Sequence, residues 1–311
     1  MSDSSRKVLV LGYGEMGHAM QTLLGERHQL MIWEKYPRDD FVSVSLEDAV
    51  PKAEILLFCL PVVAHRSVLD EVIPILDRES ICLSIAKGLD EEGKTAAQIF
   101  EEKLHSSRPR VLLYGPMISE EIRAGRLAFG QLGFDRAQDF RFVHDLFAGT
   151  PLYIEPRDDT PGISWSVILK NVYAMLFGIS DELELGDNMR GYLAVTALHE
   201  LDRIVLAMGG QAYSPFSLAG LGDLLQPIGI GTRCVFAADA DLESAAASGA
   251  DLALNASEYP VSVASELACD HLAELFVDLR YAPGVNHNDP FLGGKSHDRG
   301  RRDVIAEPEA D

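Results

Sequence analysis

The sequence predicts an α/β domain built on a doubly wound parallel sheet, followed by an all-helical C-terminal domain. Through the first half, short apolar runs alternate with helical patterns, as in repeated strand-helix-strand units. A glycine-rich turn follows the first of these runs at Gly12. From about Pro161 onward the apolar periodicity is that of helices alone. We therefore expect domains at residues 1–160 and 161–284, and a disordered tail at 285–311.

The expected elements follow from the spacing of apolar residues and from the glycines and prolines that end each run. Continuous apolar runs indicate buried parallel strands at 7–12, 28–34, 54–60, 80–85 and 111–114. Helical spacing between them predicts helices at 16–24, 68–76 and 94–104. The second half should contain helices at 163–177, 188–208, 216–225 and roughly 261–279, with Asp187 and Asn188 as the N-cap of the second.

The charge balance excludes some classes of partner. The chain has 48 acidic and 27 basic residues, which give a net charge of −21. Such a surface disfavours nucleic acids and anionic membranes, although a locally basic site could still take an anionic small molecule. The longest apolar run, 55–64, is too short to insert across a bilayer.

Cysteine usage and the N-terminus indicate a cytoplasmic protein. The four cysteines have no metal-ligand spacing, so no metal site is expected, and Cys59 and Cys82 lie in apolar runs as core thiols. The polar start of the chain leads directly into the first strand, which is unlike a secretory signal.

The glycine pattern Gly12-x-Gly14-x-x-Gly17 predicts a dinucleotide site of the Rossmann type. It stands between an expected strand and an expected helix, which is the context that this motif requires. The first glycine permits the tight turn, the second lets the backbone approach a diphosphate, and the third lets helix and strand pack closely. A merely structural turn is the alternative. If the site exists, further candidates for cofactor contact are Glu15, Met16, Pro61, Ser119 and Arg233.

Glu34 favours NAD over NADP as the cofactor. It ends the second strand, about 20 residues after the motif, where a carboxylate can accept hydrogen bonds from the adenosine ribose and would repel a 2′-phosphate. Lys35 and Arg38 follow closely and could accommodate a phosphate, so NADP stays open. An exposed strand end is the plainer reading of Glu34.

Two lysines are candidate catalytic groups. Lys170 lies in an apolar helical run, and a lysine in such a place is costly to bury unless its charge is used. Hydride transfer to a ketone creates an alkoxide, which an ammonium group can stabilise and protonate. Lys87 follows a strand end, where open α/β sheets bind ligands. The alternatives are a snorkelling helix lysine and a surface loop lysine.

Two further charged residues could complete the site. Asp223 lies in an apolar, glycine-bearing segment, where it could pair with a buried lysine or cap the next turn. Arg233 follows a glycine-rich loop, and an arginine beside helix N-terminal amides is suited to phosphate, although a surface arginine is as plausible.

Together these segments resemble the NAD(P)-dependent glycerol-3-phosphate dehydrogenases. The likeness runs from about residue 7 to 233 and rests on the order of several motifs. Besides the glycine turn they are A-K-G-L at 86–89, G-P-M-I-S-E-E-I at 115–122, D-T-P-G-I at 159–163, L-K-N-V-Y-A at 169–174, G-I-S-D-E-L-E-L-G-D-N at 178–188 and L-A-G-L-G-D-L at 218–224. The resemblance implies a Rossmann domain followed by a helical domain like the C-terminal domain of 6-phosphogluconate dehydrogenase.

The same resemblance implies roles for individual residues. Lys170 would be the proton donor and acceptor, with Asn171 beside it, and Lys87 would touch both nicotinamide and substrate. Asp223 would position the catalytic lysine. Substrate contacts would come from Gly115, Met117, Thr232, Arg233 and Cys234. The implied reaction reduces dihydroxyacetone phosphate to sn-glycerol 3-phosphate in glycerophospholipid metabolism, and a homodimer is compatible with the likeness.

The chain also departs from the family pattern. An asparagine usually follows the arginine where Cys234 stands, and Pro227-Ile228 replaces a threonine-cysteine pair. These changes weaken the expected phosphate contacts more than the hydride chemistry. A related reductase of another small oxo-acid or phosphorylated ketone therefore stays as an alternative, as does a dinucleotide-binding regulatory protein without turnover.

Overall fold

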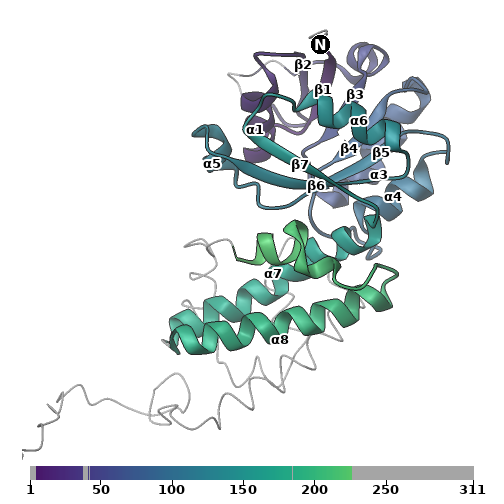
Figure 1. Cartoon of the computed structure of the whole chain (residues 1–311). Coiled ribbons are helices and arrows are strands. Elements are labelled where there is room, and N and C mark those ends of the chain that lie inside the picture. The colour runs from purple at the N-terminus through teal and green to yellow at the C-terminus, as the bar shows by residue number, and fades with distance from the viewer. Residues whose placement is uncertain (1–4, 38–40, 42, 184, 226–311) are drawn as a thin grey trace, which may run out of the picture.

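A seven-stranded sheet and a pair of long helices make up the part of the chain that this computed structural model describes, namely residues 5–37, 41, 43–183 and 185–225. The strands are β1 (Lys7–Leu11), β2 (Gln29–Trp33), β3 (Ile55–Phe58), β4 (Ile81–Ser84), β5 (Arg110–Tyr114), β6 (Ala128–Phe134) and β7 (Leu152–Arg157). The helices are α1 (Glu15–Leu24), α2 (Leu46–Ala49), α3 (His65–Val72), α4 (Ala96–Lys103), α5 (Ser119–Arg123), α6 (Ala137–Leu146), α7 (Thr160–Glu182) and α8 (Gly186–Ala207). Figure 1 shows α7 and α8 as a separate layer beneath the sheet and its helices.

The sheet has the strand order β2-β1-β3-β4-β5-β6-β7. The first five strands are parallel, and the connections wind outward in both directions from β1. The order therefore reverses between β1 and β3, and ligands of open α/β sheets bind beyond the carboxyl ends of the strands at such a point. The fold thus places the glycine turn after β1 beside the end of β3.

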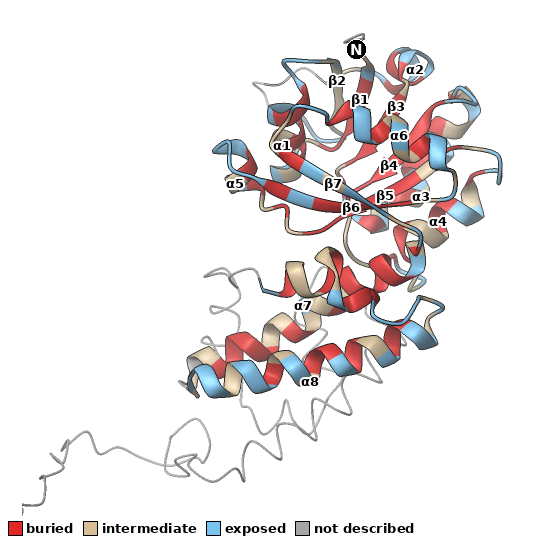
Figure 2. Cartoon of the chain, viewed as in Figure 1, coloured by how far each residue is buried: buried red, intermediate tan, exposed pale blue. Residues whose placement is uncertain are grey.

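Two hydrophobic cores cover the two faces of the sheet, because alternate side chains of each strand point to opposite sides. Leu9 and Leu11 of β1 join the core on one face, whereas Val8 and Val10 join the core on the other. All four residues of β3 and of β4 are buried, which explains why these strands appear in the sequence as unbroken apolar runs. Figure 2 shows this burial along the centre of the sheet.

The helical layer has its own core between α7 and α8. Trp165, Leu169 and Tyr173 of α7 pack with Leu193 and Leu201 of α8. Over Thr160–Asp181, α7 meets the length and hydropathy criteria of a membrane span, with a mean hydropathy of 1.3, but 72% of that apolar window is buried within the structure. Its apolar character therefore fits the core of a folded domain.

The first turns of α7 join the two layers. Ile163 and Val167 belong to the same core as the strands of the sheet. Asp159, immediately before α7, accepts a hydrogen bond from the Gly162 N–H and caps the helix. Its other carboxylate oxygen accepts a bond from Gln211 N–H, so the loop after α8 is fastened to the start of α7.

The structure corrects several sequence-based expectations. The sheet is not wholly parallel, because β6 runs antiparallel to β5, and β6 and β7 were not predicted. The helix expected at 216–225 is instead a 3-10 turn at Ser214–Phe216 followed by a π-helical turn at Leu218–Gly222. The N-cap of α8 is Leu185, without a side-chain bond, and Asp187 and Asn188 lie within its first turn. The helix expected at 261–279 and the tail at 285–311 lie outside the described residues.

Candidate active site at the carboxyl edge of the sheet

The turn between β1 and α1 has the backbone of a dinucleotide cradle. Gly12 adopts φ +95°, a left-handed conformation that favours glycine. A Cβ at Gly17 would lie 2.4 Å from the Gly12 carbonyl oxygen, so only glycine lets helix and turn approach this closely. A Cβ at Gly14 would meet nothing within 4 Å, which leaves open space before the N-terminus of α1 where a diphosphate would bind. These residues fit a bound dinucleotide.

Glu34 lies against this turn. Its carboxylate accepts hydrogen bonds from the Tyr13 N–H at 2.7 Å and from the Tyr36 N–H at 3.3 Å. The Glu34 N–H donates to Ser43 Oγ at 2.8 Å. The carboxylate is therefore fixed at the end of β2, beside the second residue of the glycine motif.

Asp223 brings the two predicted lysines together. It directly follows the π-helical turn and is 1% exposed. Lys87 extends from the loop after β4 and donates a hydrogen bond from Nζ to Asp223 Oδ2 at 2.5 Å. Lys170 extends from α7, and its Nζ lies 3.3 Å from Oδ1. Three segments far apart in sequence thus meet at one carboxylate between the sheet and the helical layer.

The electrostatics of this cluster suit an anionic ligand. The Lys87 and Lys170 side chains are 26% and 14% exposed, whereas the Asp223 side chain is fully buried. Burial lowers the pKa of Lys87, the negative charge of Asp223 opposes this, and the positive charge of Lys170 lowers the Lys87 pKa further. Two amines that share one carboxylate leave net positive charge in a chain whose net charge is −21. Such a site can stabilise and protonate a developing oxyanion.

The turn after β5 lies beside the Asp223 segment. Gly115 adopts φ +150°, and a Cβ there would lie 2.5 Å from the Phe129 carbonyl oxygen. Pro116 lies 3.7 Å from the Cβ position of Gly222, next to Asp223. Met117 is buried in one of the sheet cores. The structure therefore brings Gly115 near the lysine cluster, while Met117 faces the protein interior.

The other predicted contacts are placed with varying proximity to the cluster. Glu15 begins α1 and pairs with Arg123 at 2.9 Å, and Met16 is half-buried beside it. Pro61 is exposed just past the end of β3. The buried Ser119 hydroxyl donates to Glu120 at 2.9 Å. Asn171 is exposed on α7. It lies on a different face from Lys170, because consecutive helical residues point about 100° apart.

Thr232, Arg233 and Cys234 lie outside the described residues. The two cysteines expected as core thiols do lie in the sheet domain, where Cys82 is buried and Cys59 is half-buried. Burial raises the pKa of Cys82 to about 12. Burial also raises the pKa of the Cys59 thiol, so both thiols stay protonated at neutral pH.

Gln131 is a site residue that sequence reasoning missed. Its side chain is buried on β6, where Oε1 accepts bonds from the Ser217 hydroxyl at 2.8 Å and the Ala219 N–H at 3.3 Å. These bonds tie the π-helical turn before Asp223 to the sheet. The signal was a glutamine inside the run A-F-G-Q-L-G-F, but the strand itself had not been predicted.

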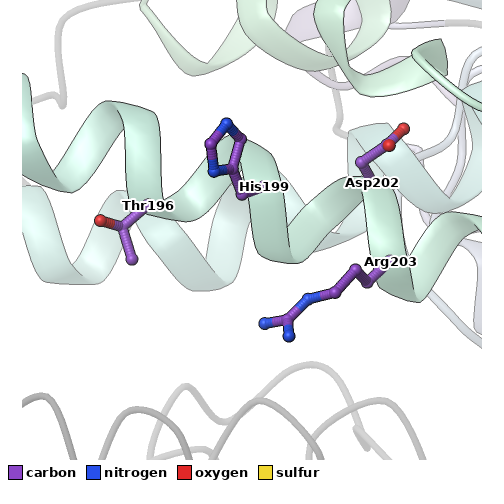
Figure 3. A pocket seen from close by; sticks show the side chains of 4 residues that line it. All are labelled: Thr196, His199, Asp202 and Arg203. Atoms are coloured by element: carbon purple, nitrogen blue, oxygen red, sulfur yellow. The ribbon is translucent and has the colours of Figure 1, made fainter.

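A pocket on α8 lies apart from this cluster. It is lined by Thr196, His199, Asp202 and Arg203, all from α8 (Figure 3). None of the sequence-predicted site residues contributes to it. The two predicted lysines instead gather around Asp223.

Comparison with known proteins identifies relatives of this chain. Residues 35–136 match the family model of the NAD-dependent glycerol-3-phosphate dehydrogenase N-terminus, and residues 159–229 match that of the C-terminus. The glycerol-3-phosphate dehydrogenase [NAD(P)+] of Fusobacterium nucleatum is 30% identical over 244 residues, covering 70% of this chain and 73% of the relative. That of Gloeobacter violaceus is 31% identical over 221 residues, covering 70% and 71%.

The chain belongs to the NAD(P)-dependent glycerol-3-phosphate dehydrogenase family. Solved structures of glycerol-3-phosphate dehydrogenases share its fold. The enzyme from Coxiella burnetii superposes with a TM-score of 0.67 at 20% identity, covering 89% of this chain and 90% of the other. The Saccharomyces cerevisiae enzyme gives a TM-score of 0.63 at 18% identity, covering 93% and 98%. The Rossmann-type sheet followed by a helical domain is thus the family architecture.

Proposed function

We propose that this glycerol-3-phosphate dehydrogenase family member reduces dihydroxyacetone phosphate to sn-glycerol 3-phosphate with a reduced nicotinamide cofactor. The observation that carries the proposal is the single buried carboxylate of Asp223 between the amines of Lys87 and Lys170. It lies at the carboxyl edge of the sheet, on the same edge as the glycine turn. We take the substrate from the relatives, which are named glycerol-3-phosphate dehydrogenases.

The proposed mechanism gives each residue a separate task. The turn at Gly12, Gly14 and Gly17 would hold a reduced nicotinamide dinucleotide, which would supply the hydride for the carbonyl carbon of the substrate. Lys170 donates a proton from Nζ to the oxygen of that carbonyl as negative charge develops there, and accepts it back in the reverse direction. Lys87 binds the same end of the substrate as a cation. Asp223 holds both amines in place and offsets their mutual repulsion.

Although both amines act at the carbonyl end, the net positive charge of the cluster also attracts an anionic, phosphorylated substrate. Replacing dihydroxyacetone phosphate by unphosphorylated dihydroxyacetone should therefore reduce kcat/KM far more than kcat. A panel that adds small oxo-acids tests the alternative of a related reductase. Tight NADH binding without turnover on any ketone would instead indicate a regulatory dinucleotide-binding protein.

The direct test compares two lysine variants by the loss of NADH absorbance. Lys170→Met keeps the apolar stem and removes the proton donor, and kcat should fall by about 100-fold or more, the usual contribution of a positioned acid. Lys103→Met is the control. Lys103 lies away from the site, where its Nζ forms an ion pair with Asp70 at 2.8 Å, so its removal should leave kcat unchanged. Equal activity of Lys170→Met and wild type would overturn the assigned role.

We further propose NAD as the preferred cofactor. The Glu34 carboxylate is fixed beside the glycine turn by two backbone N–H groups, where it can accept bonds from ribose hydroxyls and would repel a 2′-phosphate. In Glu34→Gln the ratio of kcat/KM for NADH to that for NADPH should fall by about tenfold, the effect of about 1.4 kcal/mol. An unchanged ratio would show that other groups set the preference.

The family membership also suggests where the protein acts and how it assembles. We propose a cytoplasmic enzyme that acts on small molecules and forms a homodimer. Light scattering of the purified full chain at several concentrations gives the assembly state directly, and a monomer at all concentrations would contradict the dimer.

A further inference from the structure

A buried hydrogen-bond chain connects the end of β3 with the loop that carries Lys87. The His65 ring places Nδ1 3.1 Å from the Pro61 carbonyl oxygen and Nε2 2.9 Å from Ser84 Oγ. Ser84 Oγ also accepts the Ala86 N–H at 3.2 Å. The Tyr114 hydroxyl donates to the Ala86 carbonyl at 3.0 Å. Ala86, the residue before Lys87, is therefore held at both of its backbone groups.

The donor and acceptor groups of this series of hydrogen bonds determine the direction of each bond. The Pro61 carbonyl can only accept, so Nδ1 of His65 carries the proton. In the neutral ring Nε2 can then only accept, so the Ser84 hydroxyl donates its proton to Nε2 while its oxygen accepts the Ala86 N–H. This arrangement requires a neutral imidazole, and burial lowers the pKa of His65 to about 4. At neutral pH every donor in the chain has one acceptor.

Packing alone does not account for these polar groups. His65 is fully buried, and its ring lies 5.0 Å from that of Phe58 and 5.8 Å from that of Phe100. A phenylalanine could fill this aromatic cluster without the cost of burying a polar ring. The distinguishing consequence of the histidine is that it orients Ser84, and Ser84 in turn fixes Ala86.

We propose that His65 and Ser84 are positioning residues for Lys87, which connect the end of β3 at Pro61 to the lysine that binds substrate. The inference rests on the proposed function, because it concerns how well Lys87 is placed for that reaction. Neither residue touches the Asp223 cluster; they act through Ala86. Arg66, the next residue of α3, pairs with Asp90 at 2.5 Å and holds the far end of the same loop.

The chain offers a matched control in a second buried serine. Ser80 immediately precedes β4 and donates to the Ala53 carbonyl at 2.6 Å, at the opposite end of the strand from Lys87. Ser84→Ala and Ser80→Ala each remove one buried hydroxyl, and both should lower Tm. Only Ser84→Ala should lower kcat/KM for dihydroxyacetone phosphate, by about fivefold, the equivalent of one hydrogen bond. The Kd of NADH should change by less than about twofold in both.

A double-mutant comparison separates positioning from general loss of stability. In a Lys87→Met background, Ser84→Ala should lower kcat/KM no further, since the group it positions is gone. The inference would be overturned if Ser84→Ala lowered kcat/KM fivefold both in wild type and in Lys87→Met. It would also be overturned if Ser80→Ala lowered kcat/KM as much as Ser84→Ala.

Amide hydrogen exchange tests the same idea without turnover. Ser84→Ala should accelerate exchange at the Ala86 and Lys87 amides more than Ser80→Ala does, because the Ala86 N–H loses its acceptor. Equal exchange in the two variants would overturn the positioning role. A wild-type protein that is inactive on dihydroxyacetone phosphate would refute the proposed function alone, since the exchange comparison would still decide the positioning role.

Discussion

A single residue, Asp223, lets two lysines share one carboxylate. The Asp223 carboxylate contacts both Nζ atoms, and its negative charge opposes the effect of burial on the pKa of Lys87. Neither lysine could be held this close to the other without an intervening anion, because like charges at short range disfavour ionisation. The aspartate is thus needed to hold the two lysines together, and it is a part of the proposed chemistry.

Asp223→Asn should move the pH dependence of the reaction in a defined direction. The negative charge of Asp223 raises the pKa of Lys87 against the effect of burial. Without this charge the pKa should fall further below its usual range. The lysine then loses its proton at lower pH, and the basic limb of the pH profile of kcat/KM for reduction should shift toward acid. At neutral pH kcat/KM should fall by about 100-fold, equivalent to about 3 kcal/mol for a broken buried pair.

Asp181→Asn is the matched control for this variant. Asp181 also pairs with a basic group, Arg190 at 2.5 Å, but at a half-exposed position between α7 and α8. Its removal should leave the pH profile in place. A basic limb that stays fixed in Asp223→Asn would contradict the assigned electrostatic role.

Gly14 provides a second prediction at this scale. Its φ of −78° suits any residue, and an added Cβ meets nothing within 4 Å, so Gly14→Ala should fold with an unchanged Tm. The new methyl group would instead occupy the space where a diphosphate lies, so the Kd of NADH should rise by about tenfold or more, the equivalent of about 1.4 kcal/mol. Gly191→Ala, at an equally open position on α8, should leave the Kd unchanged. Unaltered NADH binding in Gly14→Ala would place the diphosphate elsewhere.

Among the elements, the π-helical turn at Leu218–Gly222 determines where Asp223 lies. Such turns are rare and often occur at functional sites. Here the turn is anchored at its start by Gln131 of β6, which receives both the Ser217 hydroxyl and the Ala219 N–H. An antiparallel strand added to the parallel sheet thus supports the acid of the helical layer.

Gln131→Leu should therefore impair both stability and activity. The substitution keeps the side-chain volume but leaves the Ala219 N–H without its acceptor, at a cost of about 1–3 kcal/mol. The Ser217 hydroxyl keeps the Ser214 carbonyl oxygen as an acceptor at 2.6 Å. We expect a clear fall in kcat/KM for dihydroxyacetone phosphate, because Asp223 follows the loosened turn. Gln98→Leu removes a comparable bond, from the Thr95 N–H at 3.0 Å in the cap of α4, and should lower stability without changing kcat/KM. Parallel losses of activity in both variants would argue against a specific role of the turn.

For the whole molecule, His65 makes stability depend on pH. Its pKa falls from 6.5 to about 4 on folding, so between these values the unfolded chain binds more protons than the folded one. The free energy of unfolding should therefore be highest above pH 6.5 and fall as the pH drops toward 4. At about 1.4 kcal/mol per unit, the loss amounts to about 3 kcal/mol.

Urea unfolding at a series of pH values measures this effect. His65→Phe keeps the aromatic packing and should lose less stability than wild type between pH 6.5 and 4, while the acidic groups common to both cancel in the difference. His105→Gln, at an exposed position, should follow the wild-type curve. Curves of identical slope for His65→Phe and wild type would contradict the buried neutral state of His65.

The sequence by itself determined the fold class and indicated the residues that we propose for the site. Unbroken apolar runs specify parallel strands covered on both faces, and the glycine spacing specifies a turn that no other residue could form as closely. Lys170 and Asp223 were identifiable because charged groups in apolar surroundings need a partner, and Lys87 because it follows a strand end. These are local signals, readable from neighbours in the chain.

Only the tertiary structure decided which charges meet and what holds them. That one carboxylate contacts both lysines depends on the packing of α7 against the sheet, which brings together segments more than half the described chain apart. Gln131, His65 and Ser84 act through backbone groups of other segments, so their partners leave no pattern in the sequence. Long-range contacts of this kind arise from the packing of whole elements, whereas sequence periodicity reports only the face that each element buries.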